Sequence, residues 1–314
     1  MNKVHLLARH EKLMGSPFTI ETYVPDARPD REVEFFISLA FGEIRRIEDL
    51  LTDFRDSPFN DINKMAGIRP VRVCREIFDL VQLSLQFSRE SEGAFDISYA
   101  SVGHLWRAGM KTGLPPSEDQ IVEAKRHVNF RKIQMDEDRM EIFLPHQAMR
   151  IGFGGIGKGY AVDRAFQVLR TCGLTNFFVN GAGDIRVQSE EKAPRPWRIA
   201  VRNPLSDNPL ASMACLQIKN GAIATSGDYE RFFECRGKKY HHVLDGRSGE
   251  ITQEVSSATV LCQNTLDADV YATIAMVLGP QKGLEFLNQK KEVSGFLVTP
   301  EGKTGMTNSL KLPL

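Results

Sequence analysis

Residues 152–163 read Gly152-Phe153-Gly154-Gly155-Ile156-Gly157-Lys158-Gly159-Tyr160-Ala161-Val162-Asp163, and they place a loop almost free of side chains, with one lysine, at the start of a helix. Glycines let backbone N–H groups approach an anion closely, and the first helical turn adds unpaired N–H groups and the positive end of the helix dipole. The helix is indicated by apolar residues at helical spacing and by a glycine that can end it: Ala161, Val162, Ala165, Leu169, Cys172 and Gly173. The segment predicts either a phosphate-binding loop or a plain structural turn, and the pattern alone does not choose between them.

Two nucleotide-binding patterns overlap on this loop, and each lacks a part. The loop fits G-x-x-x-x-G-K, but Gly159 follows the lysine where a P-loop has the Ser or Thr that binds magnesium. It also fits G-x-G-x-x-G, yet the acidic residue expected about 20 positions later in a Rossmann fold is not evident. Residues 177–184 instead read as a short strand that runs into a second glycine turn. A nucleoside triphosphatase and a Rossmann dehydrogenase are both disfavoured.

The composition bounds the size of the core and the class of partner. With 314 residues and 42% hydrophobic content, the chain can bury a large core, and we expect residues 1–314 to form a single domain or two intimately packed halves. Lys plus Arg and Asp plus Glu both number 40, so no global field favours nucleic acid or an anionic membrane. The five cysteines are scattered and form no C-x-x-C pair, which argues against a disulfide framework and a zinc site.

The apolar runs of the chain are short. The first ten residues contain too few consecutive apolar positions for a signal peptide, and no later run approaches the 20 or so that span a bilayer. We therefore expect no membrane span and a cytoplasmic location, or a periplasmic one if an export segment has been removed.

Long helices in the first half and many short strands in the second half are the main signals of architecture. We expect helices over about residues 35–51, over 70–88 with Pro70 in the first turn, after Ser117 as a cap, and from Asn264 or Thr265 to Leu278. We expect strands over residues 18–24, 141–144, 150–153, 197–201, 214–218, 231–235, 239–244 and 255–262. This order favours an α+β fold with largely antiparallel sheets and flanking helices.

One helical pair has the spacing of a cation site. Asp269 and Thr273 are four residues apart, so their oxygens share one helix face near its N-terminus. Magnesium would accept this pair together with a backbone carbonyl and waters. In the alternative interpretation Asp267 and Asp269 only complement the helix dipole, and Thr273 is a surface residue.

A second polar segment contains two adjacent histidines, His241 and His242. Neighbouring residues of a strand point to opposite faces, so one histidine can line a site while the other is buried or solvated. Asp245 follows where a tight turn could bring it near His242, which would give a base and a residue that orients it. A purely structural histidine is the alternative.

The order of these segments along the chain resembles the ApbE family of FAD:protein FMN transferases, over about residues 14–287. The resemblance rests on seven motifs in one order: Met14-Gly15-Ser16, Gly93 to Asp96, Gly155 to Asp163, Asn180 to Asp184, Thr225 to Arg231, His242 to Gly249, and Ala268-Asp269 to Thr273. It implies an α+β flavin-binding fold and magnesium-dependent cleavage of the FAD pyrophosphate. FMN would pass to a Thr or Ser hydroxyl of an acceptor flavoprotein, with release of AMP.

The resemblance also implies roles for individual residues. Mg²⁺ would be held by Asp269, Thr273 and the main-chain carbonyl of Gly155. FAD, the substrate, would be contacted by residues from several segments: Met14, Phe54, Ala94, Phe95, Asp96, Gly152, Lys158, Asp163, Thr225, Ser226 and Leu244. His242 would be the base for the acceptor hydroxyl, and Asp245 would orient it.

Three positions depart from the pattern of similar proteins. Gly152 stands where they usually carry an aspartate, Phe54 where they often carry a tyrosine, and Gly246 where a proline is common. Phe54 retains a stacking surface but has no hydroxyl. These changes leave the metal pair intact and weaken the expected flavin site. Two alternatives therefore accompany the transferase: a magnesium-dependent FAD pyrophosphatase that gives FMN and AMP, and a non-catalytic flavin-binding protein.

Overall fold

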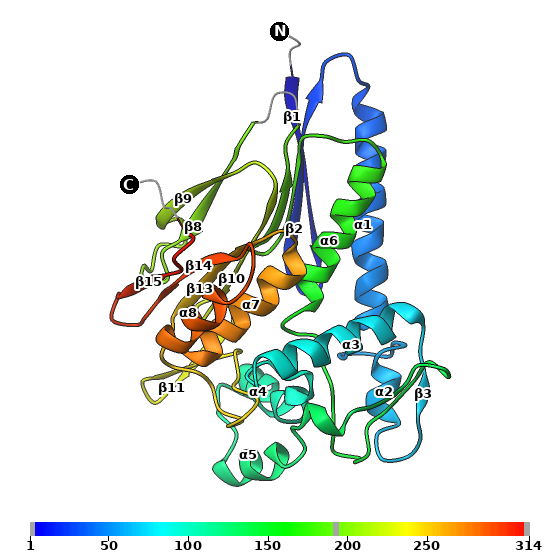
Figure 1. Ribbon diagram of the computed structural model, residues 1–314, viewed down its shortest axis with the longest axis vertical. Coiled ribbons are helices and arrows are strands. Elements are labelled where there is room, and N and C mark those ends of the chain that lie inside the picture. The colour runs from blue at the N-terminus through cyan, green and yellow to red at the C-terminus, as the bar shows by residue number, and fades with distance from the viewer. Residues whose placement is uncertain (1–3, 191–194, 311–314) are drawn as a thin grey trace.

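The computed structural model of the chain describes residues 4–190 and 195–310 (Figure 1). The helices are α1 (Asp30–Leu51), α2 (Asn60–Lys64), α3 (Arg75–Glu90), α4 (Ala100–Thr112), α5 (Glu118–Lys125), α6 (Gly157–Thr171), α7 (Thr265–Leu278) and α8 (Pro280–Asn288). The strands are β1 (Val4–Leu13), β2 (Ser16–Pro25), β3 (Val71–Arg72), β4 (Gln134–Asp136), β5 (Glu141–Phe143), β6 (Phe177–Gly181), β7 (Asp184–Gln188), β8 (Trp197–Arg202), β9 (Ser212–Ile218), β10 (Gly221–Gly227), β11 (Phe232–Cys235), β12 (Lys238–His241), β13 (Ser257–Cys262), β14 (Ser294–Val298) and β15 (Thr304–Met306).

An eight-stranded sheet in the order β1-β2-β6-β7-β10-β13-β14-β15 forms the centre, and all its neighbouring strands are antiparallel. Helix α6 packs against α1 and against α7, and the three helices cover one face (Figure 1). The β8–β9 hairpin covers part of the other face, where Trp197 and Leu216 pack with sheet residues such as Val187 and Ile223. The expected α+β fold with antiparallel sheets and flanking helices is confirmed.

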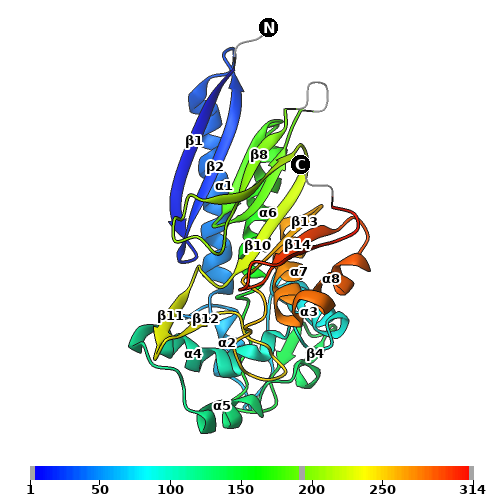
Figure 2. The same cartoon turned by 90° about the vertical axis from the view of Figure 1, so that its left-hand side faces the viewer.

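Helices α2 to α5 and the small β11–β12 hairpin gather beyond one end of this sheet (Figure 2). Helix α1 runs along the sheet and continues to this end (Figure 1). Among the described residues, the largest core cluster of buried side chains extends from Leu13 in β1 to Leu297 in β14, and smaller clusters lie under the β8–β9 hairpin and beside α4. The glycine loop and the first turn of α6 lie where the sheet half meets the helical half, so both halves can contribute to a site there.

The first hairpin delivers the turn Met14-Gly15 to this junction. Both residues have positive φ, 51° and 70°, as a two-residue hairpin turn requires. The Met14 methyl group lies 3.6 Å from the position of a Cβ atom at Gly157. The strand expected over residues 18–24 is therefore confirmed within β2, and its hairpin partner β1 was not predicted.

Two expected elements are wrong. Residues 150–153 form no strand, because the side-chain amide of Asn63 takes the place of a neighbouring strand: it accepts from Ile151 N–H at 2.8 Å and donates to the Ile151 carbonyl at 3.0 Å. Pro70 does not begin a helix. The residues after it pair with β5 through Val71, and α3 begins only at Arg75.

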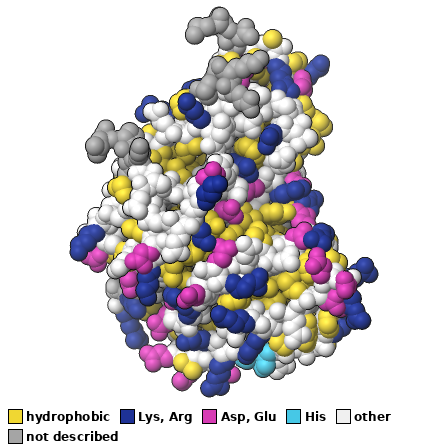
Figure 3. All heavy atoms as spheres, viewed as in Figure 1, with side chains coloured by type: hydrophobic (Ala, Val, Ile, Leu, Met, Phe, Trp, Pro, Cys, Tyr) yellow, Lys and Arg dark blue, Asp and Glu magenta, His cyan; other side chains and the backbone are white. Residues whose placement is uncertain are grey.

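Helix ends agree with the sequence signals. Ser117 forms a capping box with Gln120 at the start of α5, the side chain of Asn264 accepts from Asp267 N–H at the start of α7, and Gly173 follows α6 with a φ of 79°. Basic and acidic side chains are interspersed over the face drawn in Figure 3, as expected for equal numbers of both. In the part of the chain that the structure describes, no helix is both long and apolar enough to span a bilayer.

Candidate functional site

The first turns of α6 and α7 cross in close contact. A Cβ atom at Gly159 would lie 2.7 Å from the Thr265 carbonyl oxygen and 2.9 Å from Cβ of Asp269, so only glycine allows this approach. Asp269 is 5% exposed, and its Oδ2 accepts the Gly159 N–H at 3.1 Å. The contact fixes one carboxylate oxygen of Asp269 beside the glycine loop.

Thr273 and Gly155 lie at the same place. The Thr273 Oγ1 is 3.1 Å from the Ser226 Oγ and 3.5 Å from the position of a Cβ atom at Gly155. A carboxylate, a hydroxyl and a nearby loop carbonyl are the oxygen ligands that suit Mg²⁺. Among residues 4–190 and 195–310, no group of three or more His, Cys, Asp and Glu side chains could hold a metal. A metal here would depend on hydroxyl and carbonyl oxygens as well as Asp269.

Acidic side chains outnumber the single lysine at this corner. The Lys158 ammonium contacts the carboxylate of Asp184, which is almost fully buried, and also faces Asp269 and Glu230. Burial would lower the pKa of Lys158, but the carboxylates outweigh it and raise that pKa. Burial and the charge of Asp269 raise the pKa of Asp184. A divalent cation would favour the ionised forms of these acidic side chains, so their gathering here fits a metal site.

Asp163, expected to contact FAD, has another role in the structure. Its Oδ1 accepts from Thr265 N–H at 3.0 Å and its Oδ2 from Leu266 N–H at 2.9 Å, so it caps α7 from α6. Arg186 pairs with the same carboxylate at 2.6 Å. Asp163 therefore holds the helix that carries Asp269 and Thr273.

The turn Ala94-Phe95-Asp96 forms a wall of the site. Phe95 lies 3.3 Å from the Cβ position of Gly155. Asp96 is buried and caps the turn at Ile97–Tyr99, because its carboxylate accepts from the Ser98 N–H at 2.7 Å and the Phe130 N–H at 3.0 Å. Burial raises its pKa. Of the expected FAD contacts in this turn, the structure brings Phe95 to the glycine loop and commits the Asp96 carboxylate to backbone amides.

His241 is buried and His242 is exposed, so the two differ as expected, although β12 ends at His241 and the strand predicted over residues 239–244 is shorter. His241 is buried between the Thr252 carbonyl, at 2.6 Å from Nε2, and the Val243 N–H, at 3.2 Å from Nδ1. His242 is solvent-exposed although protein surrounds much of its ring, which hydrogen-bonds the backbone of Arg231. This burial, with the positive charges of Arg231 and other nearby groups, lowers the pKa of His242 to about 4. A neutral imidazole of this kind can accept a proton at neutral pH.

Asp245 does not orient His242. Both its carboxylate oxygens bond to the Arg247 guanidinium, at 2.9 and 3.2 Å from Nε, and Oδ1 accepts from the Arg247 N–H. The tight turn after the strand brings Asp245 to a basic side chain two residues later, which competes more effectively than a neutral imidazole. Leu244 is buried against Val102, Trp106 and Ile251.

Strand β10 brings two expected contacts to the sheet side of the site. The Thr225 Oγ1 is 2.9 Å from the Thr259 Oγ1 on β13, and Ser226 reaches Thr273. Ser226 therefore lies beside Thr273, one of the expected metal ligands, whereas the hydroxyl of Thr225 is bonded within the sheet.

Phe54 and Gly152 lie at the beginning of the glycine loop. Phe54 is 76% exposed, and the Arg107 guanidinium lies over its ring at 4.7 Å. A Cβ atom at Gly152 would lie 3.3 Å from Oδ2 of Asp53. Asp53, Arg107, Asp184 and Glu230 lie beside the expected site residues and were not predicted from the sequence, although Asp184 and Glu230 stand within the quoted motifs.

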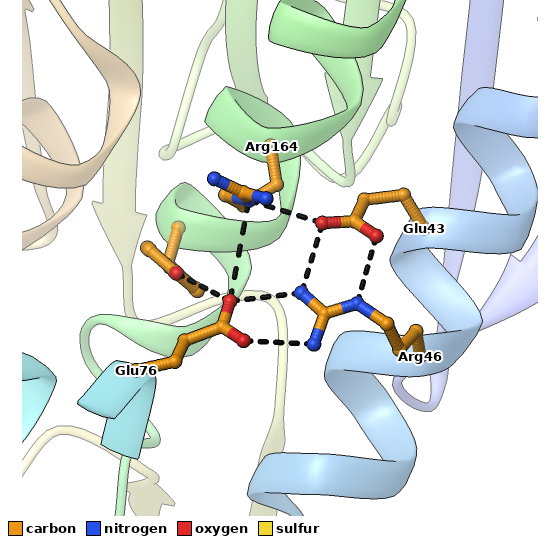
Figure 4. Close-up of polar contacts among 5 residues, drawn as sticks. Glu43, Arg46, Glu76 and Arg164 are labelled. Carbon is orange, nitrogen blue, oxygen red and sulfur yellow. Dashed lines mark hydrogen bonds and ion pairs between the residues drawn. The ribbon is translucent and has the colours of Figure 1, made fainter. Parts of the chain in front are cut away.

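A polar network supports α6 on its outer side. Glu43 and Arg46 from α1 interact with Glu76 from α3 and Arg164 from α6 (Figure 4). The Tyr160 hydroxyl, two residues after Lys158, donates to Glu76 at 2.6 Å. Three helices thus share one network just behind the first turn of α6.

Comparison with known proteins gives consistent results. The model of the ApbE family matches residues 14–297. A protein of Klebsiella pneumoniae (strain 342) named FAD:protein FMN transferase is 34% identical over 289 residues, which cover 91% of this chain and 87% of that protein. A protein of the same name from Treponema pallidum (strain Nichols) is 27% identical, and the match covers 95% of this chain and 86% of that protein.

Solved structures agree in fold. The ApbE protein of Thermotoga maritima superimposes with a TM-score of 0.86 at 27% identity and covers 98% of both chains. The flavinyl transferase ApbE of Pseudomonas stutzeri gives a TM-score of 0.81 at 28% identity and covers 98% of this chain and 95% of that one.

Proposed function

The chain belongs to the ApbE family, and from this membership we propose that it is an FAD:protein FMN transferase. FAD is its substrate, and a flavoprotein with an exposed Thr or Ser is the acceptor. The observation that carries the proposal is the crossing of α6 and α7, which gathers Lys158, Asp269 and Thr273 around the glycine loop. A pyrophosphate needs this combination of a cation, a hard-metal site and a close backbone.

Asp269, Thr273 and the carbonyl of Gly155 would hold Mg²⁺, and the acidic surroundings described above support that choice. When bound, the ion neutralises charge on the pyrophosphate oxygens as it develops. The Lys158 ammonium would bind the same oxygens, and nearby carboxylates raise its pKa, so it is charged at neutral pH. Asp163 keeps α7 in register with α6, which holds the ligands in place.

His242 takes the proton of the acceptor hydroxyl. The hydroxyl oxygen attacks the phosphorus on the FMN side of the pyrophosphate, the bond from that phosphorus to the bridging oxygen breaks, and AMP leaves with the bridging oxygen. The lowered pKa keeps the imidazole free to accept a proton, and its exposed position leaves access for an acceptor chain. Asp245 has no part in this step because Arg247 occupies it.

Met14, Phe54, Phe95 and Ser226 form the remaining contacts to FAD in this proposal, with residues 1–314 acting as one domain. The support for one domain is the largest core cluster, which includes side chains from β1 to β14 and therefore from both halves of the chain. A cytoplasmic location, or a periplasmic one after export, stays a prediction.

The test is incubation of the protein with FAD and an acceptor polypeptide carrying a Thr near an acidic residue, with Mg²⁺ or with EDTA. We expect Mg²⁺-dependent AMP release together with covalent FMN on the acceptor, seen by mass spectrometry. AMP release without a modified acceptor would favour the FAD pyrophosphatase. Tight FAD binding without AMP under any divalent metal would favour a non-catalytic flavin-binding protein.

A further inference from the structure

The Asp53 side chain fills the space that the missing side chain of Gly152 leaves. A Cβ atom at Gly152 would lie 3.3 Å from Oδ2 of Asp53 and 3.2 Å from Cβ of Ala100. Both distances are shorter than ordinary van der Waals contact, so a side chain at residue 152 and the Asp53 carboxylate compete for one place. The two residues are 99 positions apart in sequence, and the contact exists only in the folded chain.

The carboxylate is held there by a partner on another helix. Arg107 of α4 donates to Oδ2 of Asp53 at 2.8 Å, and the Asp53 side chain is 13% exposed. Asp53 follows the C-terminal end of α1, where the helix dipole disfavours a negative charge. The position is therefore electrostatically costly by itself, and the ion pair with Arg107 offsets that cost.

The groups around this carboxylate lie beside the start of the glycine loop. Phe54, the next residue, is exposed and carries the Arg107 guanidinium over its ring. The Tyr99 hydroxyl hydrogen-bonds the backbone of Gly154 in the glycine loop and would lie 3.7 Å from a Cβ atom at Gly152. An acceptor, a donor and an apolar ring surface thus meet at the start of the loop.

We infer that Asp53 is a substrate-binding residue, which presents from the end of α1 the carboxylate that the glycine loop lacks at residue 152. It accepts a hydrogen bond from an N–H group on the edge of a planar heteroaromatic ring that lies against Phe54, and Arg107 donates to the acceptor atom beside that N–H. This inference rests on the proposed function, because FAD offers such an edge twice, in the imide of the flavin and in the amino side of the adenine.

The experiment measures dissociation constants for FAD, FMN and ADP without an acceptor protein, by flavin fluorescence quenching and by calorimetry. The variants are Asp53→Ala, Gly152→Asp and the double variant. We expect Asp53→Ala to weaken FAD binding by about 10- to 100-fold, as for a lost hydrogen bond to a charged group. Gly152→Asp alone puts two carboxylates in one place and weakens binding as well. The double variant restores a single carboxylate there and recovers binding to within about fivefold of wild type.

A purely structural ion pair would behave differently. In that case Asp53→Ala would lower the unfolding midpoint, and Gly152→Asp would not rescue FAD binding in the double variant. The matched control is Asp49→Ala, which removes an aspartate near the same end of α1 that pairs with Arg55. We expect it to leave FAD binding unchanged.

FMN and ADP each carry one of the two rings of FAD, so their dissociation constants identify the ring that Asp53 binds. Weaker FMN binding by Asp53→Ala with unchanged ADP binding assigns Asp53 to the flavin imide, and the reverse assigns it to adenine. A folded Asp53→Ala variant that binds FAD within about twofold of wild type overturns the inference and leaves the proposed function intact. A wild-type protein that binds no FAD overturns both.

Discussion

Asp163 of α6 and Asp269 of α7 reach across the same helix crossing. They differ in how many of their carboxylate oxygens already have a partner within the protein. Each accepts backbone N–H groups from the first turn of the opposite helix. Asp163 uses both oxygens in this way and also pairs with Arg186. Asp269 accepts one amide, and no Lys, Arg or His of the described residues lies within ion-pair distance of it. The difference makes Asp163 a structural cap and leaves Asp269 able to bind a cation.

The same difference separates His242 from Asp245. The carboxylate of Asp245 is fully used by Arg247, whereas the His242 ring is exposed and has only a backbone partner. In both pairs the residue types suggested a functional role for each member. The partners provided by the fold decide which member is available to a substrate.

The largest expected effect comes from Asp269→Asn. The amide oxygen can still accept the Gly159 N–H, but the charge that would hold Mg²⁺ is gone. We expect the rate of AMP release from FAD to fall at least about 100-fold, because metal stabilisation of the transition state accounts for several kcal/mol. The rate is measured by chromatography of AMP with saturating FAD and Mg²⁺.

Thermal unfolding of Asp269→Asn is the control, and its midpoint should stay close to that of wild type. An unchanged AMP release rate would remove Asp269 from the metal site. A loss of activity that only follows unfolding would make Asp269 a cap like Asp163.

Asp163→Ala should lower stability and leave the rate of AMP release nearly unchanged, the opposite of Asp269→Asn. It removes the acceptors of two helix N-terminal amides and leaves Arg186 without its carboxylate, so we expect the free energy of unfolding to fall by about 2 kcal/mol. Urea unfolding measures this value. AMP release well below the unfolding midpoint should remain within about fivefold of wild type, because no ligand of the pyrophosphate is lost. A large loss of FAD affinity in a stable Asp163→Ala protein would restore Asp163 as a direct FAD contact.

The pKa of His242 predicts how FMN transfer and stability depend on pH. Since it is lowered from 6.5 to about 4, the ring is neutral over that range, and the acidic limb of FMN transfer should lie well below pH 6.5. The unfolded chain takes up the proton first, so this histidine lowers stability progressively as the pH falls from 6.5 towards 4. His242→Ala should slow transfer by about 100-fold and flatten the stability profile in that window. A transfer limb centred near pH 6.5 would contradict the assignment.

Asp245→Asn should have the smallest effect. The amide can keep the turn bond to the Arg247 N–H while the ion pair is lost, so we expect a stability change below about 1 kcal/mol. FMN transfer should change less than about threefold, with no shift of its pH dependence. A loss as large as that of His242→Ala would show that Asp245 orients the base after all.

The features that the sequence predicts correctly depend on residues that are close together in the chain. The glycine loop, the start of α6, the Asn264 cap and the spacing of Asp269 and Thr273 all follow from residues within one or two turns of one another. The Arg150 to Phe153 strand failed because the partner of Ile151 is a side chain of Asn63, 88 positions earlier. Hydrophobic periodicity cannot predict a pairing between a side chain and a distant backbone segment.

The sequence by itself determined the α+β class, most of the helices and strands, and the shared face of Asp269 and Thr273, because short-range backbone geometry and hydrophobic spacing fix them. Only the tertiary structure decided that Asp163 caps α7, that Asp245 forms an ion pair with Arg247, and that Asp53 occupies the space beside Gly152. Those choices depend on how close the packed helices and loops come to one another, because this packing decides which internal hydrogen-bonding partners each polar side chain meets.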